Sequence, residues 1–320
     1  MTRYGFHASH EQIAPGPLLA DVQRAEQAGF EVAMCSDHFS PWSRRQGHSA
    51  NTWPWLGAAL ATTGLSFGTV SAPGQRYHPA VLAQAIATLG AMFPGRFWVA
   101  LGSGEAFNEH ITGDRWPRKE VRVQRLEECV AVIRRLLEGE EVSHDGLVTV
   151  DRARLWEVPD PRPRLVAPAV SLPSASRVAA WGEGMITVNQ PPEQLREMVS
   201  AYRDAGGDGP LALQVHLSWA PTEDEAEALA HDQWRSNVFT EPVMWDTETA
   251  EGFDAVSEDV PPEKVRTVVD VSADLAWHRD RLHSYAELGF DEIYLHHVGK
   301  SQAAFIDAFG EHVLPALKAG

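Results

Sequence analysis

The chain has 320 residues, of which 44 are acidic and 27 are Lys or Arg, so its formal net charge at pH 7 is −17. This charge argues against a nucleic-acid partner and against an anionic membrane surface, because both are bound through clustered lysines and arginines. Two cysteines are too few for a disulfide framework, and no run of about 18 apolar residues is present, so we expect a cytoplasmic protein without a transmembrane helix.

Short apolar segments typical of buried strands alternate with helical segments along the chain. The expected strands, in chain order, are Arg3–Ser9, Glu31–Ser36, Leu65–Ala72, Phe97–Leu101, Leu165–Val170, Met185–Val188, Leu211–Trp219 and Glu292–His297. The expected helices are Pro17–Gly29, one after Ser49, Pro79–Phe93, Lys119–Glu138, Ala175–Trp181, Pro192–Ala205, Glu223–Asn237, Ala273–Leu288 and Gln302–Leu317.

Two polar stretches interrupt this alternation, residues 140–163 after the fourth strand and residues 240–262 after the seventh. The first contains several prolines and is typical of an excursion or a short hairpin. Eight strand–helix units with short apolar strands favour a parallel sheet covered by helices, and eight units suggest that the sheet closes into a barrel. We therefore predict a single-domain (β/α)₈ TIM barrel over residues 1–320, with insertions after strands 4 and 7.

An open, doubly wound sheet is the alternative fold. A dinucleotide-binding sheet of that kind would carry a GxGxxG turn after its first strand. The residues in that place are His7-Ala8-Ser9-His10-Glu11, which contain no glycine. The barrel is therefore the preferred prediction.

In a barrel of this class the catalytic groups lie at the carboxyl ends of the strands. His38, just after the second strand, is the strongest candidate for a base, because a neutral imidazole can take a proton near pH 7. Asp37 or Glu11 could orient it or balance its charge. The alternative is a buried histidine with satisfied hydrogen bonds, and the strand-end position favours the functional interpretation.

A second candidate is Glu105, in the turn Gly102-Ser103-Gly104-Glu105 after the fourth strand. The glycines allow the backbone to approach a ligand, and a carboxyl group there can donate a proton. A glutamate that merely suits the start of a helix explains the residue equally well.

The tryptophans Trp42, Trp53 and Trp55 follow the second strand, where they could form an aromatic wall for a ring or pack beneath a loop. His296 and His297 are adjacent on a strand, so they face opposite sides, and only one can point into the barrel mouth. We find no His/Cys set with metal-ligand spacing and expect no metal site.

Four segments together resemble the luciferase-like flavin and deazaflavin oxidoreductases, and within them the F420-dependent glucose-6-phosphate dehydrogenase group. They are Ala8–Gln12 (ASHEQ), Ser36–Trp42 (SDHFSPW), Arg76–Val81 (RYHPAV) and Leu101–Glu109 (LGSGEAFNE). The SDHFSPW and GSGEAFNE segments are specific, and all four occur in the order of the family. The resemblance extends more weakly to the C-terminus.

The resemblance implies a (β/α)₈ barrel that binds F420, or alternatively FMN, across its C-terminal mouth. It implies that His38 takes a hydroxyl proton as hydride leaves for the cofactor, that Trp42 and Glu11 place the reacting groups, and that Glu105 is an acid beside the ring. The residues implied to bind the cofactor are Asp37, Thr69, Val70, Ser71, Gly102, Ser103, Gly104, Asn108, Ser171 and Ser174. A bulge with a non-prolyl cis peptide bond is implied within Thr69–Ser71, at a cost of roughly 3 kcal/mol.

The sequence also departs from the family pattern. The sugar-phosphate enzymes hold the substrate phosphate with two lysines and an arginine, and here the matching places have Pro191, no lysine between Thr247 and Val260, and Val268. We therefore expect a small-molecule substrate other than a sugar phosphate. A family Gly-Gly pair after the fifth strand is also missing. Ser171, Ser174 and the start of the next helix would hold a cofactor phosphate instead.

Three hypotheses follow from these residues. The first is an F420-dependent oxidoreductase that acts on an alcohol or hemiacetal carbon, with His38 as base. The second is an FMN-dependent oxidoreductase or monooxygenase on the same scaffold. The third is a cofactor carrier without catalysis, which would have no need of an acid and a base. Because relatives are often dimers, we expect a homodimer.

Overall fold

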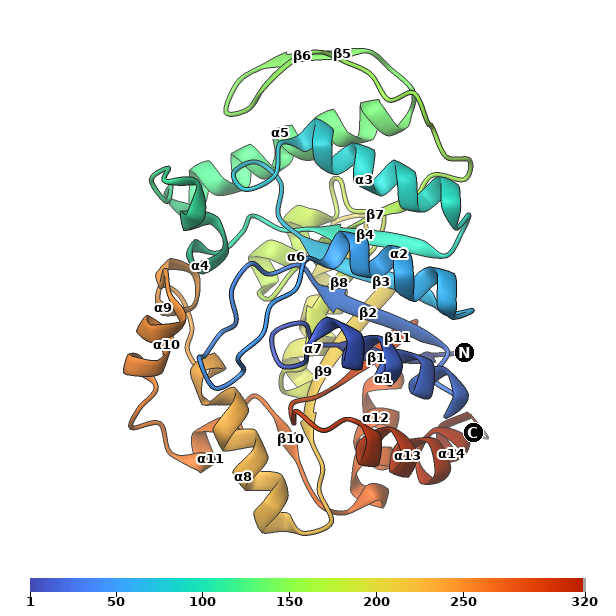
Figure 1. Cartoon of the computed structure of the whole chain (residues 1–320), viewed down its shortest axis with the longest axis vertical. Helices are drawn as coiled ribbons and strands as arrows, with labels where there is room; N and C mark the ends of the chain where they lie inside the picture. The colour runs from blue at the N-terminus through green and yellow to red at the C-terminus, as the bar shows by residue number, and fades with distance from the viewer. Residues whose placement is uncertain (319–320) are drawn as a thin grey trace.

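The computed structural model describes residues 1–318, and within them eight parallel strands form a closed barrel wrapped by helices (Figure 1). The strands are β1 (Arg3–Ala8), β2 (Val32–Ser36), β3 (Ser66–Ser71), β4 (Phe97–Leu101), β7 (Arg164–Pro168), β8 (Met185–Val188), β9 (Leu211–Ser218) and β11 (Glu292–His297). Pairing of β8 with β9 and of β11 with β1 completes the ring, and β10 (Asp270–Val271) adds to β9. The predicted (β/α)₈ barrel is confirmed.

Helices cover the outside of the barrel at the expected places. They are α1 (Pro15–Gln27), α2 (Thr52–Thr62), α3 (Pro79–Met92), α5 (Lys119–Leu137), α6 (Leu172–Val178), α7 (Pro192–Asp204), α8 (Glu223–Trp234), α12 (Leu275–Ala286), α13 (Ala303–His312) and α14 (Leu314–Lys318). Short turns α4 (Ala106–Glu109), η1 (His110–Thr112) and η2 (Arg235–Asn237) accompany them. Helix α6 begins three residues before its expected start, because Pro173 fits the first helical turn.

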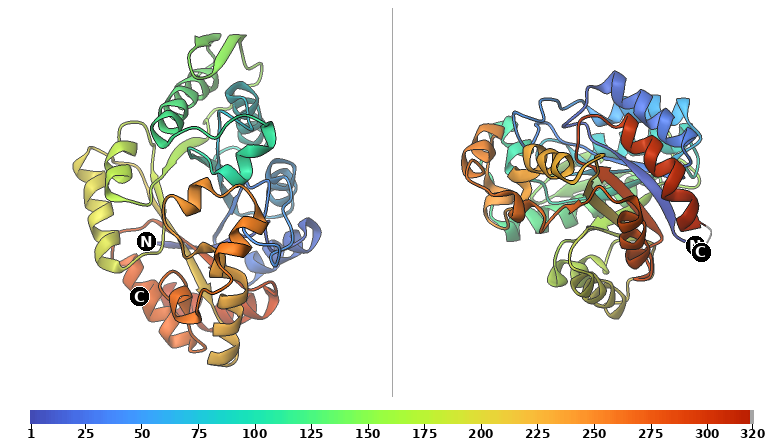
Figure 2. Two further views of the ribbon diagram at one scale, coloured as in Figure 1. Left: turned by 90° about the vertical axis from the view of Figure 1, so that its left-hand side faces the viewer. Right: turned by 90° about the horizontal axis from the view of Figure 1, so that it is seen from below.

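The two expected insertions have different structures. The first forms an antiparallel hairpin of β5 (Val142–Asp145) and β6 (Thr149–Ala153), which lies beyond α5 at the top of Figure 1. The second forms three short helices, α9 (Val243–Asp246), α10 (Ala250–Val256) and α11 (Pro262–Val265). Figure 2, left, looks onto the carboxyl ends of the strands and shows these orange helices in front of the barrel. The second insertion therefore lies next to the predicted site.

Side chains fill the barrel interior. Two aromatic side chains dominate it, Trp98 and Tyr294, whose ring centroids are 6.1 Å apart. A Cβ atom added to Gly68 would lie 2.0 Å from the Trp98 ring, and one added to Gly5 would lie 2.5 Å from Tyr294. These glycines leave the space that the two rings occupy, so the small residues and the large ones are complementary.

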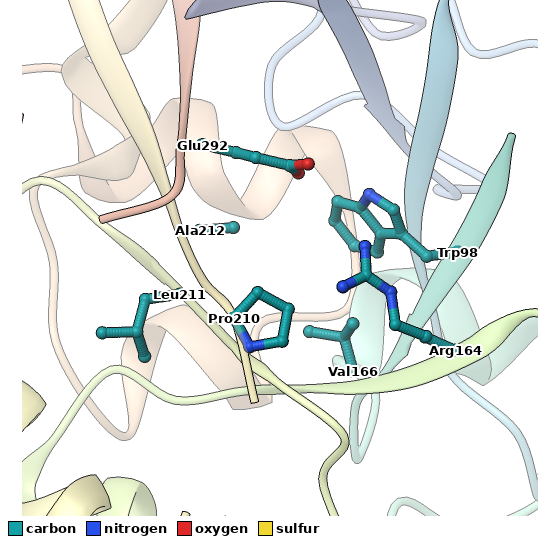
Figure 3. Close-up of a pocket in the computed structure, with 7 residues that line it drawn as sticks. All are labelled: Trp98, Arg164, Val166, Pro210, Leu211, Ala212 and Glu292. Carbon is teal, nitrogen blue, oxygen red and sulfur yellow. The ribbon is translucent and has the colours of Figure 1, made fainter. Parts of the chain in front are cut away.

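A small cavity of about 10 Å³ lies at the amino ends of the strands, where Glu292 and Trp98 face each other across it (Figure 3). Such a volume holds about one water molecule and no organic substrate. None of the helices within residues 1–318 is long and apolar enough to span a membrane.

Candidate active site

His38 lies between two carboxylates at the carboxyl ends of the strands. Its Nδ1 is 2.5 Å from Oε1 of Glu11, in the loop after β1, and its Nε2 is 3.6 Å from Oε2 of Glu105, in the loop after β4. The side chain of Glu11 is 4% exposed, whereas those of His38 and Glu105 are 15% and 26% exposed. The three residues meet because parallel barrel strands all end at the same rim. The Nε2 side of the imidazole is the side that a ligand can approach.

The three groups alter each other's proton affinity. Burial alone would raise the pKa of Glu11, but the charge and hydrogen bond of His38 outweigh burial and lower that pKa to about 2. Burial opposes the charged form of His38, yet the carboxylates of Glu11 and Glu105 prevail and raise its pKa. Burial raises the pKa of Glu105, and His38 and Asn108 offset this effect only in part. The site thus combines a permanent anion, a strengthened base and a carboxyl group that retains its proton more readily.

An aromatic wall adjoins the imidazole. The ring centroids of Trp42 and Phe107 lie 5.5 and 5.4 Å from that of His38, and Phe253 of α10 packs against both. Trp42 thus lies against His38, and its role in placing the reacting groups stays a prediction. Trp55 instead lies in the core beneath α2, with 6% of its surface exposed.

Asp37 is buried in a network of protein donors. Ser71 Oγ and Trp53 Nε1 donate to its Oδ2 at 2.7 and 3.2 Å, and Tyr77 Oη donates to its Oδ1 at 3.3 Å. The guanidinium of Arg76 lies 3.5 Å from Oδ1 and also donates to the Asp37 carbonyl oxygen at 2.7 Å. The carboxylate therefore secures the loop that carries His38. The role of Asp37 in binding the ring stays a prediction.

The expected cis peptide bond within Thr69–Ser71 is wrong. The cis bonds among residues 1–318 precede Pro161 and Pro242. Strand β3 keeps a regular register through this segment, with Val70 opposite Ala100 and Ser71 opposite Leu101, so it contains no bulge. Thr69 is fully buried on the outer face of the barrel, beside the Cys35 thiol. Of the three residues, Val70 is the one that remains partly exposed.

Asn108 links the loops that carry His38 and Glu105. Its Oδ1 accepts the backbone N–H of Phe39 at 2.8 Å, and its Nδ2 donates to Glu105 Oε2 at 3.1 Å. The turn from Gly102 through Ser103 to Gly104 is partly exposed, and Gly104 has φ of +82°, which favours glycine. A Cβ on Gly102 would meet ordinary contacts at 3.5 Å, so packing within the protein does not require glycine there.

The two serines at the start of α6 interact with each other; Ser171 is exposed and Ser174 is partly buried. Ser174 Oγ accepts the backbone N–H groups of Val170 and Ser171 at 3.2 and 3.0 Å, and the two hydroxyl oxygens are 3.0 Å apart. These bonds cap the helix. Binding of a cofactor phosphate by Ser171 and Ser174 stays a prediction.

His296 and His297 face opposite sides of β11, as the alternation of a strand requires. His296 points into the barrel and stacks on His7 with ring centroids 4.2 Å apart, whereas His297 stacks on Phe305 of α13 at 4.8 Å. In the part of the chain that the structure describes, no group of three His, Cys, Asp or Glu side chains is placed to hold a metal ion.

Sequence reasoning missed two charged residues of the site, Arg76 and Glu109. The guanidinium of Arg76 lies 3.5 Å from carboxylate oxygens of both Asp37 and Glu109, and all three side chains are at most 9% exposed. Both missed residues stand within segments that resemble the family. The signal available was the position of Arg76 after the third strand, beside Asp37 after the second.

A family model described as luciferase-like monooxygenase matches residues 1–292. The chain is 37% identical to an F420-dependent glucose-6-phosphate dehydrogenase of Beutenbergia cavernae, over 100% of this chain and 98% of that protein. It is 34% identical to an F420-dependent hydroxymycolic acid dehydrogenase of Mycobacterium tuberculosis, over 98% of this chain and 88% of that protein.

Among solved structures, the fold matches an F420-dependent secondary alcohol dehydrogenase in complex with an F420-acetone adduct. The TM-score is 0.90 at 30% sequence identity, and the match covers 99% of both chains. Together, the family model over most of the chain and relatives above 30% identity over its whole length show that this chain is an enzyme of the luciferase-like monooxygenase family.

Proposed function

We propose that the chain is an F420-dependent oxidoreductase that transfers a hydride between an alcohol or hemiacetal carbon of its substrate and the deazaflavin ring, with His38 as the base. The observation that carries this proposal is the imidazole of His38 between Glu11 and Glu105, open to ligand on its Nε2 side. The relatives and the solved neighbour support the cofactor, because all are F420-dependent dehydrogenases by name.

The residues at the barrel mouth fit a flat, largely uncharged ring. Phe39, Val170 and Leu172 keep 53%, 41% and 38% of their surfaces exposed around the mouth, and Val70 is partly exposed inside it. The missing side chain at Gly102 leaves backbone accessible for close approach. F420 would supply a ring carbon that accepts or gives up a hydride.

Side chains of the protein carry out the proton transfers of the reaction. In the oxidising direction, His38 Nε2 takes the hydroxyl proton while the carbon–hydrogen bond breaks and the carbon–oxygen bond becomes a double bond. The carboxylate of Glu11 stabilises the imidazolium that forms and holds a proton on Nδ1, so that Nε2 is the acceptor. Glu105, whose pKa is raised by burial, can donate a proton beside Nε2.

The surroundings of His38 favour an uncharged substrate. The rings of Trp42 and Phe107 contact the imidazole on one side, with Phe253 packed against them, and none of the three offers a partner to a dianionic phosphate. The substrate we propose is therefore an uncharged alcohol.

Titration of the purified protein with F420 and with FMN, followed by the visible absorbance of each cofactor, tests the cofactor. We expect saturable binding of F420, and tight binding of FMN in its place would contradict the proposal. Turnover is then measured as reduction of F420 by propan-2-ol. His38→Gln should keep the affinity for F420 and lose about 10²- to 10⁴-fold in kcat. His283→Gln, the same change at an exposed histidine on α12, is the matched control, and equal activity of the two variants would exclude His38 as the base.

A further inference from the structure

Three histidines inside the barrel border the active site but take no part in the reaction proposed above. His7 lies on β1, His216 on β9 and His296 on β11. The ring centroid of His296 is 4.2 Å from that of His7 and 5.4 Å from that of His216. The indole of Trp234 packs on His216 and His296, with ring centroids 4.7 and 4.8 Å apart. Burial lowers the pKa of both His7 and His296, and His38 is among the nearby charges that lower it further, so the cluster adjoins the site.

Gln12 determines which nitrogen of His296 carries the proton. The Gln12 amide Nε2 donates to the carbonyl oxygen of Val298, an atom that can only accept. The other amide atom of Gln12, Oε1, is therefore an acceptor, and it lies 3.0 Å from His296 Nε2. Nε2 of His296 must donate, and in a neutral ring Nδ1 is then an acceptor.

The same reasoning extends from His296 to His216. The Gln214 amide nitrogen lies 3.2 Å from His296 Nδ1 and 3.1 Å from His216 Nε2. Because His296 Nδ1 accepts, the Gln214 group there is the NH₂, and its second hydrogen is donated to His216 Nε2. With Nε2 an acceptor, the proton of neutral His216 is on Nδ1.

This N–H of His216 has no hydrogen-bond partner among residues 1–318. His216 is partly exposed. Its side chain lies on the same face of β9 as that of Gln214, which points into the barrel. Among residues 1–318 no carboxylate is paired with the ring, and burial, together with the charge of His7, lowers the pKa of His216 to about 3. The group is thus an uncharged donor at neutral pH, and an uncharged acceptor is the ligand chemistry that matches it.

We propose that the Nδ1–H of His216 donates a hydrogen bond to an uncharged oxygen of the bound ligand, and that His216 is therefore a specificity-determining residue. The oxygen belongs either to the substrate, as a second oxygen beyond the reacting hydroxyl, or to a carbonyl of the deazaflavin ring. This inference rests on the proposed function for the identity of the ligand, and on the hydrogen-bond network for the position of the donor.

The donor itself can be observed without turnover. Nitrogen NMR of the full chain carrying ¹⁵N-labelled histidine should show His216 protonated on Nδ1 and His296 on Nε2 at neutral pH, with His216→Asn used for assignment. Addition of 1-methoxypropan-2-ol, or of F420, should shift the His216 Nδ1 signal. Protonation of His216 on Nε2, or a signal that neither compound shifts, overturns the proposal.

Variants then separate the two sources of the oxygen. The side-chain nitrogen of Asn can replace Nδ1 of histidine and that of Gln can replace Nε2, so His216→Asn should keep the donor and His216→Gln and His216→Phe should lose it. The readout is the ratio of kcat/KM for 1-methoxypropan-2-ol over pentan-2-ol, an alcohol of the same shape without the second oxygen. If the substrate supplies the oxygen, this ratio should fall about 3- to 10-fold in the Gln and Phe variants and recover in the Asn variant.

If the ring supplies the oxygen, the same two variants should weaken F420 binding by a similar factor and leave the ratio unchanged. His312→Asn, at an exposed histidine, is the control that should change neither quantity. Unchanged ratio and unchanged F420 affinity in all variants would overturn the inference. Absence of turnover with both alcohols would contradict the proposed function alone, because the NMR signal and the F420 affinity still report on His216.

Discussion

Glu11 sets the strength of His38 as a base. The pKa of Glu11 is lowered to about 2, so this side chain is a carboxylate at every pH at which the enzyme is assayed, and its charge raises the pKa of His38. Oxidation needs the neutral imidazole, so kcat/KM should rise with pH and reach a plateau above the pKa of His38. In Glu11→Gln the pKa of His38 falls, the rise should move to lower pH, and the plateau should be about 10-fold lower.

The measurement is kcat/KM for oxidation of propan-2-ol between pH 5 and 9, at saturating F420. Glu31→Gln, at an exposed carboxylate just before β2 on the far end of the barrel, provides the control profile. If kcat/KM of Glu11→Gln rose at the same pH as in the wild type, Glu11 would not set the pKa of His38.

Arg76 is the one basic side chain that contacts both Asp37 and Glu109 in the part of the chain that the structure describes. Arg76→Met would leave two buried carboxylates without their counter-charge. Breaking such a buried pair costs roughly 3 to 5 kcal/mol, so we expect a loss of this order in the free energy of unfolding measured with urea. Arg154→Met, at an exposed position, should change stability by less than about 0.5 kcal/mol. Similar losses in both variants would contradict this role of Arg76.

At the scale of elements, helix α10 connects the second insertion to the loop that carries His38. Its Phe253 is fully buried against Trp42 and Phe107. The next residue, Asp254, accepts from Ser43 Oγ at 2.6 Å and pairs with Arg45 at 2.9 Å. An apolar anchor and a charged one thus hold the insertion in place beside the imidazole.

Removal of the Phe253 ring, the apolar anchor, should lower activity at the active site. Phe253→Ala leaves a cavity beside Trp42, so we expect stability to fall by about 3 kcal/mol and kcat/KM for alcohols to fall about 10-fold, with F420 affinity within about twofold of wild type. Urea unfolding, steady-state kinetics and F420 titration measure the three quantities. Val256→Ala, on the exposed side of the same helix, should leave all three unchanged. If Phe253→Ala left all three quantities unchanged, as Val256→Ala should, α10 would not shape the site.

At the scale of the whole molecule, the barrel and the meeting of His38, Glu11 and Glu105 could be predicted, because strand order alone brings strand ends to one rim. Other features depend on side-chain geometry that no sequence pattern encodes. The donors around Asp37 and the free N–H of His216 follow from contacts between residues far apart in the chain. The expected cis bond near Val70 failed because β3 retains regular pairing with both neighbours.

The packing of the whole barrel rests on the fit of Trp98 into the space above Gly68. A methyl group at Gly68 would lie 2.0 Å from the indole ring, and that ring is enclosed by the other strands, so neither can move aside without distorting the barrel. We expect Gly68→Ala to lower the free energy of unfolding by about 3 kcal/mol, the upper end of the usual cost of overpacking a core, because the added methyl group would clash so closely with the indole.

Gly57→Ala is the matched control, because Gly57 lies in α2 with no atom near its missing Cβ. That substitution should raise stability by up to about 1 kcal/mol through helix propensity. Urea unfolding of both variants decides the matter, and a Gly68→Ala protein as stable as wild type would show that the barrel interior adapts to the added volume.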